Sequence, residues 1–520
     1  MKRQWIYTIT QFIFSLKGKN MFGLIHFDVL TTVFLIIVDI IICAFVAVHI
    51  VLNKHGEPPA AVAWLIIVFS FPIAGTLLYI LFGINKMYTR GIQIKIAHDL
   101  VSSHKNNPDH QPINRYLSEQ AKFILKPENQ GDYPTYCMSL DRLLPDTVPL
   151  SGNRIELLLD GTKAYPKMLE EIEKAKNSIH LQSFIIMHDT VGKSILDRLE
   201  AKAAEGVKVK VIYDKFGSTK ALTSFLFRYF GRKTPNFEIK PFSPFHMKSP
   251  WSIQLRNHRK LLVIDGKTAF VGGINISSDN VTSIRNPYHY IHDLHCMITG
   301  PAVGEFQVSF LRDWHYVSAT HPAHLFIEEN FPRPEKYGDS IVRVIDTGPG
   351  QNHEAIEKVF FTAFSTAQRY VWIMTPYFVP DKPFIKMLCS AVARGVEVRI
   401  IVPRKNNHWY VQYATQSLYG NLLESGVRIY EKEGVFSHAK AMIVDGSWAL
   451  MGSSNCDVRS FKLNFELDFA VMRGDFLDVL HSQFQKEMSE SREVLLESIL
   501  NKKLPRQILE NTCSLLIPVL

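Results

Sequence analysis

The chain has 520 residues, 47% of them hydrophobic and 21% charged, with a formal net charge of +9. This length favours two or three structural units, and the composition excludes a disordered chain. The positive charge favours an anionic partner, either nucleic acid or an acidic membrane surface, and leaves both open. Six scattered cysteines without a Cys-x-x-Cys pair argue against a disulfide framework and a thiolate zinc site.

The N-terminal part is predicted to be a cytoplasmic extension, residues 1–27, followed by a two-span transmembrane α-hairpin, residues 28–85. The extension holds an apolar run too short to cross a bilayer, so an interfacial helix and a plain cytosolic segment stay open. The hairpin contains two apolar stretches, residues 30–52 and 60–84, each longer than the roughly 20 residues that a span needs.

Basic residues flank the hairpin, whereas its short loop, NKHGEPP, holds Lys54 alone. The flanking basic residues are Lys2, Arg3, Lys17, Lys19, Lys86, Arg90 and Lys95. By the positive-inside rule, both termini and everything after residue 85 lie in the cytoplasm. We therefore expect a multi-pass membrane protein whose larger part is cytoplasmic.

Residues 86–150 are polar and turn-rich and are predicted to be a linker. Two similar halves follow, residues 151–335 and 336–520, and each contains a strand, loop, helix, strand pattern that ends in the near-copies EGVKVKVIYD and RGVEVRIIVP. Alternating strands and helices predict an α/β fold with a largely parallel sheet covered by helices. We predict two tandem β-α-β repeats that form one pseudo-twofold unit.

Each half carries a His-x-Lys-x4-Asp signature followed by an asparagine at the same spacing. The two sets are His258, Lys260, Asp265 and Asn275, and His438, Lys440, Asp445 and Asn455. A histidine and a lysine two positions apart on a strand point to the same side. The glycines before each asparagine are expected to let a ligand approach the backbone. Two copies at equal spacing in matching context indicate function, whereas one copy would be weak evidence.

These residue types suit displacement at a phosphodiester, where negative charge grows on the non-bridging oxygens. Lys260 and Lys440 supply fixed positive charge, and the asparagine amides supply donors. One imidazole attacks phosphorus to give a phosphohistidine, while the other protonates the leaving alcohol. Histidine suits both roles because it can be neutral or charged near pH 7. No Asp/Glu cluster is seen, so neither a metal nor another cofactor is expected.

The paired motifs resemble those of the phospholipase D superfamily, and the surrounding chain resembles bacterial cardiolipin synthases from about residue 28 to the C-terminus. The segments that carry the resemblance are NHRKLLVIDGKTAFVGGINI, PYFVPD, SLYGNLLESGVRIYE, DVRSFKLNFELD, AWLIIVFSFPIAGTLLYILFG and SLLIPVL. YIHDLH, residues 290–295, departs from the Trp-Arg-Asp pattern of the family. Asp293 is retained there, and local substrate contacts are expected to differ.

The resemblance implies a phosphatidyltransferase of the bacterial cell membrane. One phosphatidylglycerol would give a phosphatidyl-enzyme and glycerol, and a second phosphatidylglycerol would resolve it to cardiolipin. His258 is implied as the nucleophile and His438 as the general acid and base, although the residues alone do not rank them. Asp293 and Glu466 are implied as the carboxylates that orient the histidines.

Asp265 and Asp445 belong to the catalytic signature, but they lie beyond an apolar strand. A structural role is therefore expected for them, such as pairing with basic groups at the strand end. His408, Trp409 and Tyr410 follow a strand end and are candidates for the substrate entrance. The tail beyond Phe476 predicts an amphipathic helix that closes the domain, with membrane contact by SLLIPVL as the alternative.

The main alternative function is a phospholipase D or a phosphatidyltransferase with another acceptor. A nuclease of the same superfamily fits the basic charge, but the apolar hairpin counts against it. Intact signatures in both halves argue against a catalytically inactive scaffold. The expected partners are phosphatidylglycerol and anionic membrane lipid rather than nucleic acid, and a homo-oligomer stays open.

Overall fold

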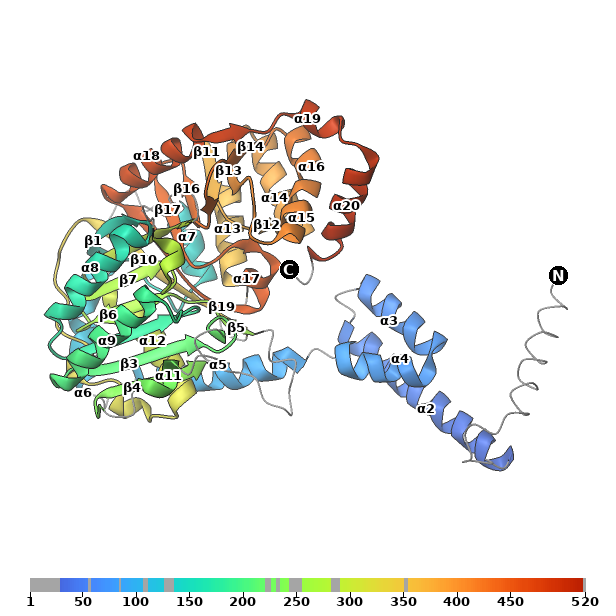
Figure 1. Ribbon diagram of the computed structural model, residues 1–520, viewed down its shortest axis with the longest axis horizontal. Helices are drawn as coiled ribbons and strands as arrows, with labels where there is room; N and C mark the ends of the chain where they lie inside the picture. Colours follow the sequence, from blue (N-terminus) through green and yellow to red (C-terminus); the bar gives the residue numbers. More distant parts are fainter. Residues whose placement is uncertain are drawn as a thin grey trace. The chain divides into compact units, whose positions relative to one another are not determined.

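The computed structural model describes most of the chain as two compact units, residues 1–85 and 86–520, drawn in Figure 1. The described residues are 29–54, 58–83, 86–105, 111–125, 135–219, 226–230, 234–242, 255–281, 290–349 and 354–517. The expected N-terminal extension, residues 1–27, lies outside this set.

The first unit is helical. Its elements are α2 (Val29–Lys54), α3 (Pro58–Ser70), α4 (Pro72–Leu78) and the π-helix η2 (Tyr79–Gly83). By length and composition, α2 is the helix within the described residues that is long and apolar enough to cross a membrane. It packs against the later helices through a small apolar cluster of Cys43, Val46, Ile50, Val68 and Tyr79.

The second apolar stretch is not one continuous helix. Proline has no amide hydrogen and collides with the preceding turn, so α3 ends at Ser70 and α4 begins anew at Pro72. Gly75 then lies so close to the backbone of Ile67 and Val68 that a Cβ atom there would overlap with it. At 1.5 Å per residue α3 spans about 20 Å, short of a hydrocarbon core of about 30 Å. The second span remains a prediction.

The second unit contains a 16-stranded mixed sheet made of two copies of one arrangement, joined by antiparallel pairing of β1 and β10. In spatial order, the first copy is β4 (Phe237–Phe242), β3 (Lys208–Asp214), β2 (Ser178–Ser183), β6 (Leu261–Ile264), β7 (Thr268–Gly272), β9 (Leu294–Thr299) and β1 (Leu150–Leu159). In the matching order, the second copy is β14 (Arg428–Lys432), β13 (Glu397–Pro403), β11 (Tyr370–Met374), β16 (Ala441–Val444), β17 (Trp448–Gly452), β19 (Asn464–Arg473) and β10 (Ser340–Thr347). The predicted α/β fold with two repeats is therefore confirmed.

The expectation of a largely parallel sheet is wrong. Among the main strands of the two copies, β2, β3 and β4 run parallel, as do β11, β13 and β14, while the other pairs are antiparallel. Each signature strand returns through a tight turn directly after its aspartate, and strands joined by a tight turn must run antiparallel. Short strands complete the unit: β5 (Arg256–Asn257), β8 (Ile291–His292), β12 (Phe378–Val379), β15 (Phe436–Ser437), β18 (Cys456–Asp457) and β20 (Ser491–Glu493).

Helices cover both faces of each copy. In the first copy they are α8 (Asp160–Lys174), α9 (Thr190–Ala204), α11 (Leu226–Tyr229) and α12 (Val303–Ser318). In the second they are α13 (Ala355–Thr366), α14 (Lys382–Ala393), α15 (Trp409–Ser417), α16 (Tyr419–Glu424), α17 (Val458–Lys462), α18 (Phe476–Ser489), α19 (Leu496–Leu500) and α20 (Leu504–Ser514). Helices α8 and α9 enclose one apolar core and α13 and α14 another, while α12 and α18 cover a core that the two copies share.

Residues 86–150, predicted as a linker, are instead mostly helical and packed onto the second unit. They include α5 (Lys86–Lys105), α6 (Gln111–Gln120) and α7 (Thr135–Leu143). Buried side chains such as Ile94 and Val101 of α5, and Leu140 of α7, belong to the main apolar cores. The polar composition of this stretch reflects helices that bury one narrow apolar side and expose the rest.

Truncation of α7 side chains tests whether this stretch is structural. Leu140 is fully buried and Leu143 in the same helix is 41% exposed. We expect Leu140→Ala to destabilise the protein by about 2–5 kcal/mol, because it leaves a cavity. Leu143→Ala, the matched control, should change the thermal unfolding midpoint of the detergent-solubilised chain little. Equal, small effects of both substitutions would restore the linker interpretation.

Candidate active site

Both signature histidines lie at the seam between the two halves. β5 leads into His258, whose amide donates to the carbonyl of Phe465 in the second half at 2.9 Å. β15 leads into His438, whose amide donates to the carbonyl of His292 in the first half at 2.7 Å. Each signature therefore begins by pairing with the other half, which brings the two motifs to one place.

The two carboxylates expected to orient the histidines are exchanged between the halves. His258 Nδ1 donates to Glu466, in β19 of the second half, at 2.9 Å. His438 Nδ1 donates to Asp293, between β8 and β9 of the first half, at 2.7 Å. Both carboxylates are fully buried. Each imidazole thus takes its partner from the opposite copy, a crossing that the separate motifs did not indicate.

Glu466 is held by further donors of its own half. It accepts from the Ser453 hydroxyl at 2.6 Å, the Ser460 hydroxyl at 2.9 Å and the Asn464 amide at 3.0 Å. Burial opposes its ionisation, but the adjacent His258 and these donors lower the pKa of Glu466. The carboxylate therefore stays charged and keeps the histidine tautomer fixed.

Burial leaves both imidazoles neutral near pH 7. It lowers the pKa of His258, against the opposing effect of Glu466. It lowers the pKa of His438 to about 4, with Lys440 acting in the same direction and Asp293 against it. Each Nδ1–H donates a hydrogen bond to a carboxylate and keeps its proton. In a neutral imidazole the other nitrogen, Nε2, therefore carries a lone pair. A neutral imidazole with an unprotonated Nε2 is the form that can act as a nucleophile or a base.

The signature lysines are buried beside these rings. Lys260 Nζ donates to the carbonyl of His258 at 2.7 Å, and Lys440 Nζ lies 2.9 and 3.2 Å from the two ring nitrogens of His438. Burial lowers the pKa of Lys260 to about 7 and of Lys440 to about 8, against the opposing charges of Glu466 and Asp293. An entering anion would favour the charged form of both.

The asparagines Asn275 and Asn455 are also buried at this seam. The side-chain oxygen of Asn275 accepts from the amide of Ile185 at 3.2 Å. Contrary to expectation, the glycines ahead of them make room for carboxylates rather than for a ligand. A Cβ atom on Gly273 would overlap with Asp293, and one on Gly452 with Asp468.

Asp265 and Asp445 do not reach the site. Each follows a four-residue strand, β6 or β16, which spans roughly 13 Å. Asp265 accepts from the amides of residues 176–178, and Asp445 from those of residues 368–370, at 2.7 to 2.9 Å. Their inclusion among the catalytic residues is corrected: they fix a turn. Their carboxylates bind backbone amides rather than the basic side chains that were expected.

Arg259 is a positioning residue that the sequence analysis missed. It is fully buried and donates to Asp313 at 2.8 Å, to Asp346, and to the carbonyl of Thr347 at 3.1 Å. It lies between His258 and Lys260 in the sequence, in the short segment that joins β5 to β6. The available signal was an arginine beside an apolar strand. A buried arginine requires carboxylate partners, so such a position indicates a buried ion pair.

His292 and His295 flank Asp293 but have different surroundings. His292 binds Asp160 at 2.7 Å and Glu487 at 2.8 Å through its two ring nitrogens. These carboxylates, against the effect of burial, raise the pKa of His292 to about 10, so its imidazole is a cation. Both ring nitrogens of His292 are engaged by protein groups, and the expectation of altered substrate contacts there stays a prediction. Burial lowers the pKa of His295 to about 3. His289 lies outside the described residues.

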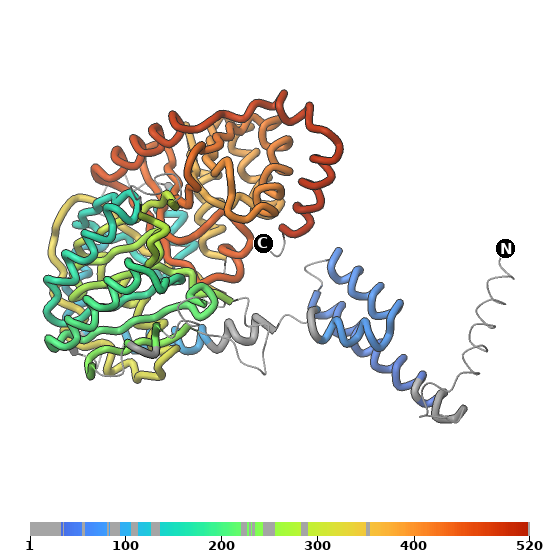
Figure 2. Tube along the Cα trace, in the orientation of Figure 1, coloured from blue at the N-terminus to red at the C-terminus, as the bar shows by residue number. Residues whose placement is uncertain are grey.

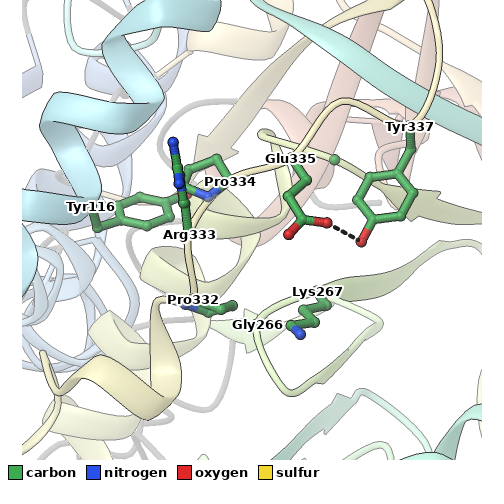
Figure 3. A pocket seen from close by; sticks show the side chains of 9 residues that line it. Tyr116, Gly266, Lys267, Pro332, Arg333, Pro334, Glu335 and Tyr337 are labelled. Carbon is green, nitrogen blue, oxygen red and sulfur yellow. Dashed lines mark hydrogen bonds between the residues drawn. The ribbon is translucent and has the colours of Figure 1, made fainter.

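A small surface hollow lies beside the Asp265 turn, as Figure 3 shows. Its lining includes Gly266, Lys267, Tyr116 and Arg333, with Tyr337 bonded to Glu335 at 3.3 Å. No signature histidine or lysine lines it, so it is separate from the seam. Within the part of the chain that the structure describes, no group of three or more His, Cys, Asp or Glu side chains is placed to hold a metal ion.

Two tandem halves that share one histidine and lysine site define a duplicated phospholipase-D-like protein. The family model described as "Cardiolipin synthase, PLD-like domain" matches residues 168–314 and 360–488, and that described as "Phospholipase_D-nuclease N-terminal" matches residues 40–83. The chain is 32% identical over 486 residues to the cardiolipin synthase of Geobacillus sp. strain WCH70, covering 92% of this chain and 93% of that protein. The chain belongs to the cardiolipin synthase family.

Further relatives and one solved structure agree with this family and fold. The major cardiolipin synthase ClsA of Bacillus subtilis strain 168 is 32% identical over 480 residues, covering 91% of this chain and 96% of that protein. The crystal structure of phosphatidylserine synthase from Haemophilus influenzae superposes with a TM-score of 0.56 at 17% identity, covering 74% of this chain and all of that one. This last likeness concerns the fold alone.

Substitutions of Asp293 and Asp445 distinguish an aspartate that orients a histidine from an aspartate that stabilises a turn. We expect Asp293→Asn to reduce turnover per folded molecule roughly 10²- to 10⁴-fold, because the charge that fixes His438 is lost. Asp445→Ala should cost about 1–3 kcal/mol of stability through its lost backbone partners, with turnover per folded molecule near the wild-type value. Rates and thermal midpoints of both variants check this. The reverse pattern would contradict the two roles.

Proposed function

We propose that this protein is a cardiolipin synthase that transfers the phosphatidyl group of one phosphatidylglycerol to the headgroup hydroxyl of a second and releases glycerol. The observation that carries the proposal is the exchanged pair His258–Glu466 and His438–Asp293 beside two buried lysines. Its family, cardiolipin synthase, matches over most of the chain.

The first half-reaction forms a phosphatidyl-enzyme. Nε2 of His258 attacks phosphorus, the bond from phosphorus to the glycerol oxygen breaks, and the proton of a His438 imidazolium passes to that oxygen. The anionic phosphodiester itself raises the pKa of an adjacent imidazole, so bound substrate favours the protonated His438 that the empty site disfavours. Lys260 and Lys440, with Asn275 and Asn455, stabilise the growing charge on the non-bridging oxygens.

The second half-reaction reverses the roles of the leaving and entering alcohols. Neutral His438 takes the proton of the headgroup hydroxyl of the second phosphatidylglycerol, and the hydroxyl oxygen attacks phosphorus. The phosphorus to nitrogen bond at His258 breaks, which restores the free imidazole. Two phosphatidylglycerols thus give one cardiolipin and one glycerol, and no oxidant, reductant or metal enters the balance.

The proposed location is the cytoplasmic side of a bacterial cell membrane. α2 provides a helix able to cross the bilayer, and the basic residues that flank the apolar stretches favour a cytoplasmic second unit. The second apolar stretch, although broken at Pro72, is proposed to return the chain to the same side. A membrane-held enzyme meets its lipid acceptor at high local concentration, which lets a bulky alcohol compete with water.

The reaction products test the function. Purified full-length protein in phosphatidylglycerol vesicles should release cardiolipin and glycerol in equal amounts. Lys260→Ala should abolish this, whereas Lys267→Ala, an exposed lysine of the same segment, should not. Predominant phosphatidic acid would instead identify a phospholipase D, and transfer only to another added alcohol would identify a different acceptor. Cleavage of DNA without any lipid product would identify a nuclease.

A further inference from the structure

Helix α20 buries a glutamate and leaves several large apolar side chains exposed. Leu504 and Ile508 are 67% and 57% exposed, and Leu515, directly after the helix on the same side, is 78% exposed. On the opposite side, Glu510 and Cys513 are 3% and 4% exposed. A helix that only closes a soluble domain buries its apolar side, so this arrangement needs another explanation.

The inward side is fixed by specific contacts, which hold the helix in this orientation. Glu510 pairs with Lys502 at 2.7 Å and with Arg506 at 2.8 Å. The guanidinium of Arg506 also lies 4.2 Å from the ring centroid of Tyr413 in α15. Rotating α20 to bury its leucines would break these pairs and leave the buried charge of Glu510 uncompensated.

The helix lies close to the catalytic seam. α20 packs along α15 at the edge of the second half, where the C-terminal segment runs in Figure 2. Cys513 and Ile517 share an apolar cluster with Tyr377. The ring of Tyr377 is 6.0 Å from that of His438, measured between centroids. The buried side of α20 is therefore connected through Tyr377 to His438.

Exposed aromatic side chains are also present on both halves. Trp409 begins α15, is 61% exposed and contacts Tyr413, with ring centroids 6.1 Å apart. Phe216 follows β3 in the first half, is 58% exposed, and lies 4.1 Å below the guanidinium of Arg256, next to the signature strand. Aromatic side chains that contact both water and apolar groups are favoured at the membrane interface.

We propose that the outward side of α20, with Trp409, lies in the headgroup and upper acyl region of a phospholipid bilayer and turns the catalytic seam toward that bilayer. This docking proposal rests on the proposed function. If both substrates are lipids, only their headgroups have to leave the bilayer to reach the catalytic seam. The exposed Lys503 at the start of the helix and the net charge of +9 suit an anionic lipid surface. Leu504, Ile508, Leu515 and Trp409 define this docking surface.

Kinetics with two substrate forms test the proposal. The double variant Ile508→Glu/Leu515→Glu should raise the apparent KM for long-chain phosphatidylglycerol in vesicles about tenfold or more, because two charges would have to enter lipid. Its turnover of monomeric short-chain phosphatidylglycerol should match the wild type. Val479→Glu is the matched control, since Val479 is 48% exposed on α18, and should change neither. Equal loss on both substrate forms, or no loss on vesicles, would overturn the proposal.

A spectroscopic readout distinguishes docking from catalysis. Ile508→Cys and Val479→Cys would carry an environment-sensitive fluorophore in a Cys389→Ser background, because Cys389 is the partly exposed native cysteine. In reconstituted vesicles with spin-labelled lipid, we expect quenching at position 508 and not at 479. Absence of lipid quenching at 508, or self-quenching between protein copies in its place, would overturn the docking surface. Short-chain turnover reports separately on the proposed function, which could fail without affecting the quenching.

Discussion

The exchanged pairing of histidines and carboxylates is the interaction on which the rest of the site depends. Glu466 of the second half holds His258 of the first, and Asp293 of the first holds His438 of the second. Burying a charged carboxylate costs free energy unless hydrogen bonds and an opposite charge compensate it. Because each carboxylate and its histidine come from different copies, either pair can form only when the two copies pack together. The antiparallel pairing of β1 with β10, which has a register shift between Leu150 and Asn153, and the apolar core that the two copies share provide that docking.

The two halves are alike in topology but not in their supporting contacts. Besides its histidine, Glu466 accepts hydrogen bonds from the side chains of two serines and an asparagine. Besides its own histidine, Asp293 accepts a hydrogen bond from the backbone amide of Leu294 at 2.8 Å. Arg259, which organises Asp313 and Asp346 behind the first signature, is replaced by the buried Ala439 in the second. Duplication supplies two similar imidazoles in unequal surroundings, which suits the proposed division of labour between attack on phosphorus and proton transfer.

Equal spacing in two copies predicted the repeated signature, and alternating strand and helix patterns predicted the α/β class, whereas Asp293 and Glu466 were implied only by the family resemblance. The sequence did not predict which carboxylate meets which histidine, since that depends on strand pairing across distant segments. Gly273 was misinterpreted for the same reason: its neighbour, Asp293, is remote in the chain. Overall polarity does not predict helices α5, α6 and α7, because such helices bury only one narrow apolar side, and the length of an apolar stretch does not show the break that Pro72 causes.

The central claim is that both halves form a single active site, and single histidine substitutions test it most directly. His258→Ala and His438→Ala, purified separately and assayed in phosphatidylglycerol vesicles, should each lose cardiolipin formation by about 10³-fold or more, because attack and proton transfer act as one unit. The variants should retain the wild-type thermal unfolding midpoint within a few degrees. If either variant kept about half of the wild-type rate, as two independent sites would allow, the account would be contradicted.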